Sequence, residues 1–574
     1  MPHPLDAEIV EEHRKNNRLA KPAPRPRPAF ALSHLGTLVC KELHDLVLTL
    51  RFSAGTTLAV LLAVLAAYIG SLDYNARLDS YQTKLKLTRD SVAETRVYSF
   101  LRPTIYRPPE PLSVLNRGLE GRLGTDYWVS IDVEHTEAEG QNRGNEYLAI
   151  FSEVDLTVVV AVILGLLALL FTFDSVCGER EAGMLKLTMS YPVSRSQFLL
   201  GKFLGAWLTL MIPTAVACIL SVLVVWMTAQ VHFGPPEYVR LSLLFLLCGL
   251  YLTVMLLVGL VVSAFSQRSF VALVFCTFTW FLFVTIAPNL ASMIPQFTGR
   301  RGQVYEAAQK KMEQVEQEQE AAVKQLRDPR NFDEKKEPMF LYHYAINNSW
   351  GGFTAFECHF GSAAFYDQTR DFFSQLIQLS LRLAAKRADI WREYIRYRER
   401  QAAEARVLSF FSPSAVFRNA AACATGTSQL DYNHFIYLAG QYRNTFIGYL
   451  QRKGAFSTWR WFTPDFADGD QPWTVLYLGK TAEEMIATGE NPQDVLNRWL
   501  HDKEAWARFL QHEQTRDRGN QSRLALGDMP AFTYTRRATG SALAQAAPEI
   551  ACLLLLNLVL FLVAYVRFVR YDVR

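Results

Sequence analysis

The sequence has little that would support chemistry of its own. It contains no H-E-x-x-H, no G-x-S-x-G and no C-x-x-C motif, and its eight cysteines stand singly. Metal-dependent and nucleophilic hydrolases and zinc modules are therefore not indicated. Cys358 and Cys423 are the two cysteines that fall in a region expected outside the membrane. One disulfide and two unpaired thiols both remain open for them. We predict that the chain is not an enzyme and holds no metal or cofactor.

A phosphate-binding loop is also lacking. Leu478-Gly479-Lys480-Thr481 has the right ending, but a phosphate loop needs a second glycine five residues before Gly479, and that position is Thr474. Backbone amides could not cradle a phosphate there. If the protein uses ATP, another chain must bind the ATP and its magnesium.

Charge bias is small, and the first residues have no long apolar run. Lysine and arginine number 59 against 55 aspartates and glutamates, which is too small an excess to predict a nucleic-acid partner. The first eighteen residues are polar and of mixed charge. We therefore expect no cleavable signal peptide, and insertion through the first membrane helix. The proline-rich stretch 21–28 should not fold.

Long apolar runs are present, separated by polar stretches. Six of them are long enough to cross a bilayer as helices. We predict an all-α polytopic membrane protein with a mainly helical extracytoplasmic domain. Its expected divisions are a flexible tail (1–30), an interfacial elbow helix (31–51), spans at 52–72, 153–174, 203–229, 239–265, 270–287 and 549–567, extramembrane units at 73–152 and 288–548, a polar segment (175–202) and a C-terminal end (568–574).

The distribution of basic residues orients these spans. Lysines and arginines near the membrane gather on the N-terminal tail, the 173–205 segment, Arg268 and the C-terminus. The positive-inside rule then predicts that both termini are cytosolic and that the large 288–548 unit lies outside. For a bacterial chain, this means the inner membrane and the periplasm.

The segment between the second and third spans is patterned. It reads CGEREAGMLKLTMSYPVSRSQFLLGK and combines charged and apolar residues around a glycine and a proline. This pattern resembles the cytosolic loop of ABC-2 type transporter permeases, where a coupling helix docks on a separate ATPase subunit. The resemblance implies an ATPase-coupling interface at Glu179, Arg180, Glu181, Gly183, Leu187, Pro192 and Arg195.

The resemblance extends to both ends of the chain. The helical pattern that begins at Leu35 is similar to the elbow helix of these permeases, with Lys41, Glu42, His44 and Asp45 on its polar side. LSFFSPSAVFRN and the C-terminal LLLLNLVLFLVAYVRFVRYDVR resemble a branch with a large insert between spans five and six. The likeness implies two ATPase copies, a second identical or similar permease, lipid and a periplasmic accessory protein as partners.

Several side chains are open to more than one interpretation. Asp155, Asp174 and Glu549 lie at span ends, where we favour structural roles. The absence of central acids argues against ion coupling and for export of something apolar or large. Ser412-Pro413-Ser414 predicts a helix start at the outer surface, favoured as an interfacial anchor over a lipid gate.

The size of the outer unit leaves a second function open. The same architecture could act as an ATP-driven mechanical transducer on an outer partner, with no substrate crossing. A receptor or scaffold without an energy source is a third hypothesis. It would leave the coupling pattern without a purpose.

Overall fold

The computed structural model describes residues 32–139, 155–190, 193–298, 301–326, 363–463 and 523–570, with isolated residues between 487 and 511. The tail 1–30, Pro192, Cys358 and Leu478–Thr481 lie outside these residues. Within the described part, helices dominate. The strands there form one antiparallel hairpin, β1 (Thr104–Tyr106) with β2 (Asp126–Trp128). The all-α prediction is therefore confirmed.

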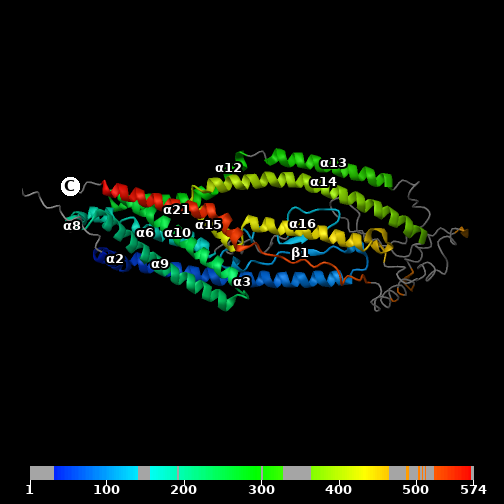
Figure 1. Ribbon diagram of the computed structural model, residues 1–574, viewed down its shortest axis with the longest axis horizontal. Helices are drawn as coiled ribbons and strands as arrows, with labels where there is room; N and C mark the ends of the chain where they lie inside the picture. Colours follow the sequence, from blue (N-terminus) through cyan, green and yellow to red (C-terminus); the bar gives the residue numbers. More distant parts are fainter. Residues whose placement is uncertain are drawn as a thin grey trace, which may run out of the picture.

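Six helical stretches of the described chain are long and apolar enough to span a membrane, as predicted. The chain is thus a multi-pass membrane protein. In Figure 1 they lie side by side as a bundle, with α2 (Leu32–Val47) along α9. The helices that form them are α3 (Leu50–Glu94), α5 (Leu156–Val159) with η3 (Val160–Leu164), α6 (Gly165–Thr172) and α7 (Cys177–Glu181), α9 (Arg195–Thr228), α10 (Pro235–Phe265), α11 (Ser269–Phe281) with η4 (Leu282–Ile286) and α12 (Ala287–Thr298), and α21 (Thr539–Val569).

The helix that contains the first span continues as a polar helix after residue 72. α3 holds 45 residues, about 68 Å at ~1.5 Å each, and ends where Thr95 turns extended. No glycine or proline occurs between residues 71 and 102, so nothing in the sequence breaks the helix where its hydropathy falls. α3 therefore runs from the bundle along the polar half of the molecule (Figure 1).

The polar half, called the stalk domain below, consists of the end of α3, residues 97–139, α13 (Arg301–Leu326), α14 (Ala363–Ser409), α16 (Gln429–Arg452) and residues 523–538. Its core joins Tyr127 to Phe373, Phe435 and Phe446. The extramembrane units that we predicted at 73–152 and 288–548 are thus joined in their described parts, because aromatic side chains from both pack into one core.

Two long helices form one side of the stalk domain (Figure 1). α13 packs along α14, and Lys311 Nζ lies 2.7 Å from Glu393 Oε2 across the pair. Lys386 and Glu318 make a second ion pair farther along. These exposed pairs fix the register of the two helices more than they stabilise them.

Helix α15 (Pro413–Thr425) corrects another expectation. Ser412 caps it and Pro413 is its first residue, as the sequence predicts. However, the helix is not an interfacial anchor, because nearly all of its side chains are buried and it packs between α10 and α21. The last span also differs, since α21 begins at Thr539 rather than at Glu549.

Candidate functional site

The predicted coupling segment forms two short helices at one end of the bundle. α7 is followed by a turn at Gly183 and by α8 (Met184–Ser190), and Ser194 caps α9. Gly183 has φ +73°, a left-handed conformation that side chains with a Cβ disfavour. No atom lies within 4 Å of where its Cβ would be, so backbone conformation rather than crowding calls for glycine here. Gly183 therefore sets the angle between α7 and α8.

Glu179 points into the bundle. Its Oε1 lies 2.7 Å from Lys202 Nζ, which also lies 2.6 Å from Glu42 Oε2 of α2. Glu42 is buried and so is not on the solvated face where the sequence put it. Burial raises the pKa of Glu42, and the neighbouring ammonium of Lys202 opposes that rise. The three side chains form a brace that joins α7, α9 and α2.

The next two charged residues bind the turn between α10 and α11. Arg180 Nη1 donates to Ser266 O at 2.9 Å. The carboxylate of Glu181 accepts from Ser269 N at 3.0 Å and from Ser269 Oγ at 2.8 Å. Both side chains therefore attach α7 to the start of the fifth span.

The fourth predicted charged residue, Arg195, contacts the end of the last span. Arg195 Nη1 donates to Val569 O of α21. Beneath it, the Phe198 ring stacks on Phe568 at 5.3 Å, and Leu185 of α8 is buried in the same small core. The segment is thus tied to α2, α10, α11 and α21.

The outer face of α8 is exposed to solvent. Met184 is 46 % exposed and Leu187 is 54 % exposed, and Lys186 between them is exposed too. Of the seven predicted residues, then, four charged ones are held by the bundle, Gly183 shapes the turn and Leu187 faces solvent. Pro192 lies outside the described residues. Glu42 and Lys202 were not predicted as site residues, although Lys202 is part of the recognised G-K pattern.

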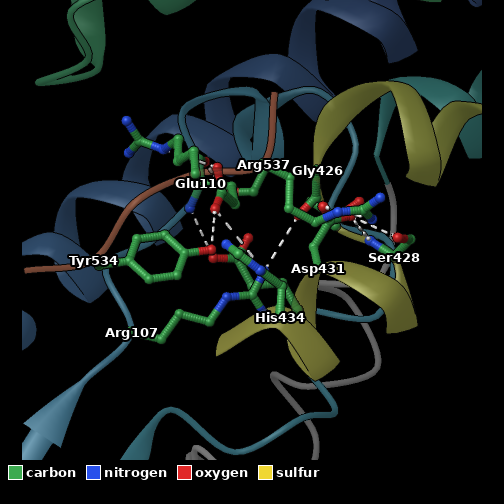
Figure 2. Close-up of polar contacts among 12 residues, drawn as sticks. Arg107, Glu110, Gly426, Ser428, Asp431, His434, Tyr534 and Arg537 are labelled. Carbon is green, nitrogen blue, oxygen red and sulfur yellow. Dashed lines mark hydrogen bonds and ion pairs between the residues drawn. The ribbon is translucent and has the colours of Figure 1, made fainter. Parts of the chain in front are cut away.

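A second polar cluster, missed by the sequence reasoning, lies where the stalk domain meets the bundle. We define this junction cluster as Arg107, Glu110, Gly426, Asp431, Tyr534, Arg536 and Arg537. Figure 2 labels all of them except Arg536.

Glu110 lies at the centre of this cluster. Tyr534 Oη donates to Glu110 Oε1 at 3.1 Å, and Arg536 Nε lies 3.0 Å from Glu110 Oε2. Burial raises the pKa of Glu110 to about 7, against the lowering by Arg536 and Arg107. The carboxyl group therefore titrates near neutral pH.

The cluster ties together segments that are distant in the chain (Figure 2). Arg107 Nη2 donates to Gly426 O at 3.2 Å, and Arg537 Nη1 lies 3.5 Å from Asp431 Oδ1. Arg240, at the start of α10, donates to Arg537 O. No sequence signal would have found the cluster, because its members come from three segments that lie about a hundred or more residues apart.

The acidic residues that the sequence places at span ends have structural partners. Asp155 caps α5 by accepting from Val158 N at 2.9 Å, and Asp174 pairs with Arg51 at 2.9 Å. Glu549 Oε1 lies 2.6 Å from Arg406 Nε of α14 while the glutamate is 1 % exposed. Cys423 is a free thiol. In the described residues, no group of three or more histidine, cysteine or acidic side chains could hold a metal.

Comparisons with known proteins agree with this architecture. A family described as ABC-2 family transporter protein matches residues 37–336, just over half of the chain. A probable ABC transporter permease protein NosY of Pseudomonas aeruginosa is 44 % identical over 61 residues, 11 % of this chain and 22 % of that protein. Its namesake in Stutzerimonas stutzeri is 30 % identical over 138 residues, 23 % of this chain and 48 % of that protein. The chain thus spans from about a fifth to about half of these relatives. It belongs to the ABC-2 transporter family.

Proposed function

We propose that the chain is the membrane permease subunit of an ATP-driven exporter, with a separate ATPase subunit docked on α8. The observation that carries this proposal is a contrast within the coupling segment between side chains that are bonded to the bundle and side chains that are exposed. Every charged residue of the predicted interface is bound to the bundle, whereas α8 presents Met184, Lys186 and Leu187 to solvent. An exposed patch of apolar and basic residues is typical of a binding surface. The α8 end of the bundle would then face the cytosol.

The contacts of this segment describe how force could enter the bundle. A push on α8 passes through Gly183 to α7, and the Glu179–Lys202–Glu42 brace carries it to α9 and α2. Arg180 and Glu181 carry the same displacement to the turn between α10 and α11. The ATPase therefore needs one docking helix to move several spans together. The ATP and magnesium belong to the ATPase.

We propose further that two ATPase subunits act on two permease chains, identical or similar, in a bacterial inner membrane. The stalk domain would then lie in the periplasm. The large stalk domain also supports the second candidate function, a mechanical transducer. α3 joins the bundle to the stalk domain as one helix, so the two halves are connected and movement of the bundle can reach the stalk domain without any substrate crossing.

Copurification tests the docking proposal. The tagged chain is expressed with the ATPase encoded beside it, and the bound ATPase is quantified. Leu187→Asp should lower the recovered ATPase by about tenfold or more, since burying a charge in an apolar contact costs at least ~1.4 kcal/mol. Leu87→Asp, at an exposed leucine of the stalk part of α3, is the matched control and should bind normally. Equal ATPase recovery with both variants would exclude α8 as the docking helix.

A further inference from the structure

Helix α15 is placed inside the bundle although both of its neighbours in sequence belong to the stalk domain. α14 leads into it and α16 follows it, while its own side chains Val416, Phe417 and Ala420 belong to the bundle core. In Figure 1 it lies beside α10 and α21, where the two halves of the molecule meet. A shift of α15 would therefore move two stalk helices at once.

The start of α15 is bound to the fifth span at an irregular turn. η4 is π-helical, and a wide turn of this kind leaves carbonyl groups that need donors from elsewhere. Ser412 Oγ and Ser414 Oγ both donate to Phe283 O within η4, the second at 2.7 Å. The hydroxyl groups of α15 thus hold the fifth span where its helix is irregular.

The middle of α15 is linked to the second span through a tyrosine of α10. The Phe417 ring stacks on Tyr251 of α10, with centroids 4.9 Å apart and planes 16° apart. Tyr251 Oη donates to Ala161 O at 2.8 Å, and Ala161 lies in η3, the second π-helical turn. Gly165 leaves room for that hydroxyl, because a Cβ there would lie 2.7 Å from Tyr251 Oη. Both irregular turns are therefore linked to α15, one directly and one through Tyr251.

The far end of α15 is bound to the stalk domain. Gly426 O accepts from Arg107 at 3.2 Å, and Thr425 Oγ1 accepts from Asn116 Nδ2 at 2.9 Å. Beyond it, Asp431 of α16 pairs with Arg537. Helices with π-turns have weakened spots at which they bend, and such turns recur at functional sites. α15 thus links two bendable points of the bundle to the stalk domain.

We infer that α15 transmits movement of the second and fifth spans to the stalk domain, with η3 and η4 as the bending points. This inference rests on the proposed function, because the ATPase supplies the movement. Ser412, Ser414, Phe417 and Tyr251 are the positioning residues of this link. The stalk domain then changes its position relative to the bundle in each ATP cycle.

Two spin-label distances in nanodiscs test the inference. One pair, Lys41 and Gln267, reports the α8 end, and the other, His232 and Thr445, reports the stalk domain against the bundle; all four side chains are exposed. Labels are introduced as unnatural amino acids, and the labelled chain is diluted into unlabelled chain. Each distance is measured with the cognate ATPase bound, before and after addition of ATP, magnesium and vanadate.

The expected result is a shift of both distances in the wild type. In Ser412→Ala/Ser414→Ala the shift at the α8 end should persist while most of the stalk shift is lost. Phe417→Leu, which removes the stacking but keeps most of the volume, should give the same selective loss and covers the case in which the serine variant does not assemble. Ser242→Ala removes a hydroxyl whose hydrogen bond within the described residues is to Tyr238 O of its own helix, and should leave both shifts unchanged.

Three results would overturn the inference. A full stalk shift in both α15 variants would mean that another element carries the movement. Equal loss of both shifts, with the ATPase still bound, would mean that α15 holds the bundle together and transmits nothing. A wild type with no shift at the α8 end would refute the proposed function itself, and the inference would fall with it.

Discussion

The brace between α2, α7 and α9 should be highly sensitive to loss of its single cation. Lys202 Nζ lies within 2.7 Å of two carboxylates, Glu42 and Glu179, and is 11 % exposed. Lys202→Met would leave both carboxylates buried without their counter-charge. Removing one partner of a buried ion pair costs about 3–5 kcal/mol. At about 1.4 kcal/mol per tenfold, the population in which α2 has separated from α9 should rise by roughly a hundredfold or more.

Hydrogen exchange measures this population directly. In Lys202→Met, the backbone amides of α2 should lose about a hundredfold of protection, whereas those of the distant α16 should not change. Adding Glu179→Gln and Glu42→Gln should recover most of the loss, because no unpaired charge then stays buried. Unchanged protection of α2 in Lys202→Met would refute the reasoning, since it would mean that the brace does not hold the helix.

Three further changes have defined outcomes. Gly183→Ala should destabilise the turn between α7 and α8 by about 1–2 kcal/mol, because φ is +73° there, and should weaken ATPase binding in the copurification assay. Arg406→Ala should lower the thermal midpoint more than Arg400→Ala, since it leaves the carboxylate of Glu549 buried and unpaired. Glu110 has a folded-state pKa of about 7 against an ordinary value of 4.5, so its protonated form contributes stability at pH 5 that is lost as the pH rises through 7. Between pH 5 and pH 8 this loss amounts to about 2–3 kcal/mol. Glu110→Gln should remove that part of the difference between thermal midpoints at pH 5 and pH 8, and an unaltered difference would contradict it.

The sequence best predicted those structural features that depend only on residues close together in the chain. Apolar runs of sufficient length predicted all six spans, because a spanning helix bonds its own backbone and needs little else. Ser412-Pro413 predicted the start of α15, because helix capping depends on residues that are neighbours in the sequence. The position of α15 inside the bundle could not be predicted, because its burial depends on α10 and α21, which are distant in sequence.

Hydropathy marked where the first span becomes polar but not how the polar helix after it is packed. The chain becomes polar at Asp73, and α3 continues to Glu94 without a glycine or proline to interrupt it. Its polar end packs with helices from the second half of the chain. That packing depends on long-range contacts between aromatic side chains, which a single sequence does not reveal.

The structure adds contacts within the coupling segment that the sequence did not reveal. The resemblance implies an ATPase interface at Glu179, Arg180, Glu181 and Arg195, and each of these side chains also bonds to the bundle. Their bonding partners lie on other helices, and periodicity within one segment does not show what is packed against it. Whether Leu187 contacts an ATPase stays a prediction.

Photo-cross-linking from α8 tests the central claim most directly. A benzoylphenylalanine at Leu187 is irradiated in membranes that contain the chain and its ATPase, with the same probe at Leu87 as the control. We predict a covalent adduct with the ATPase from Leu187 and none from Leu87. Adducts from Leu87 alone, or from neither position while the ATPase copurifies, would contradict the claim that force enters this permease through α8.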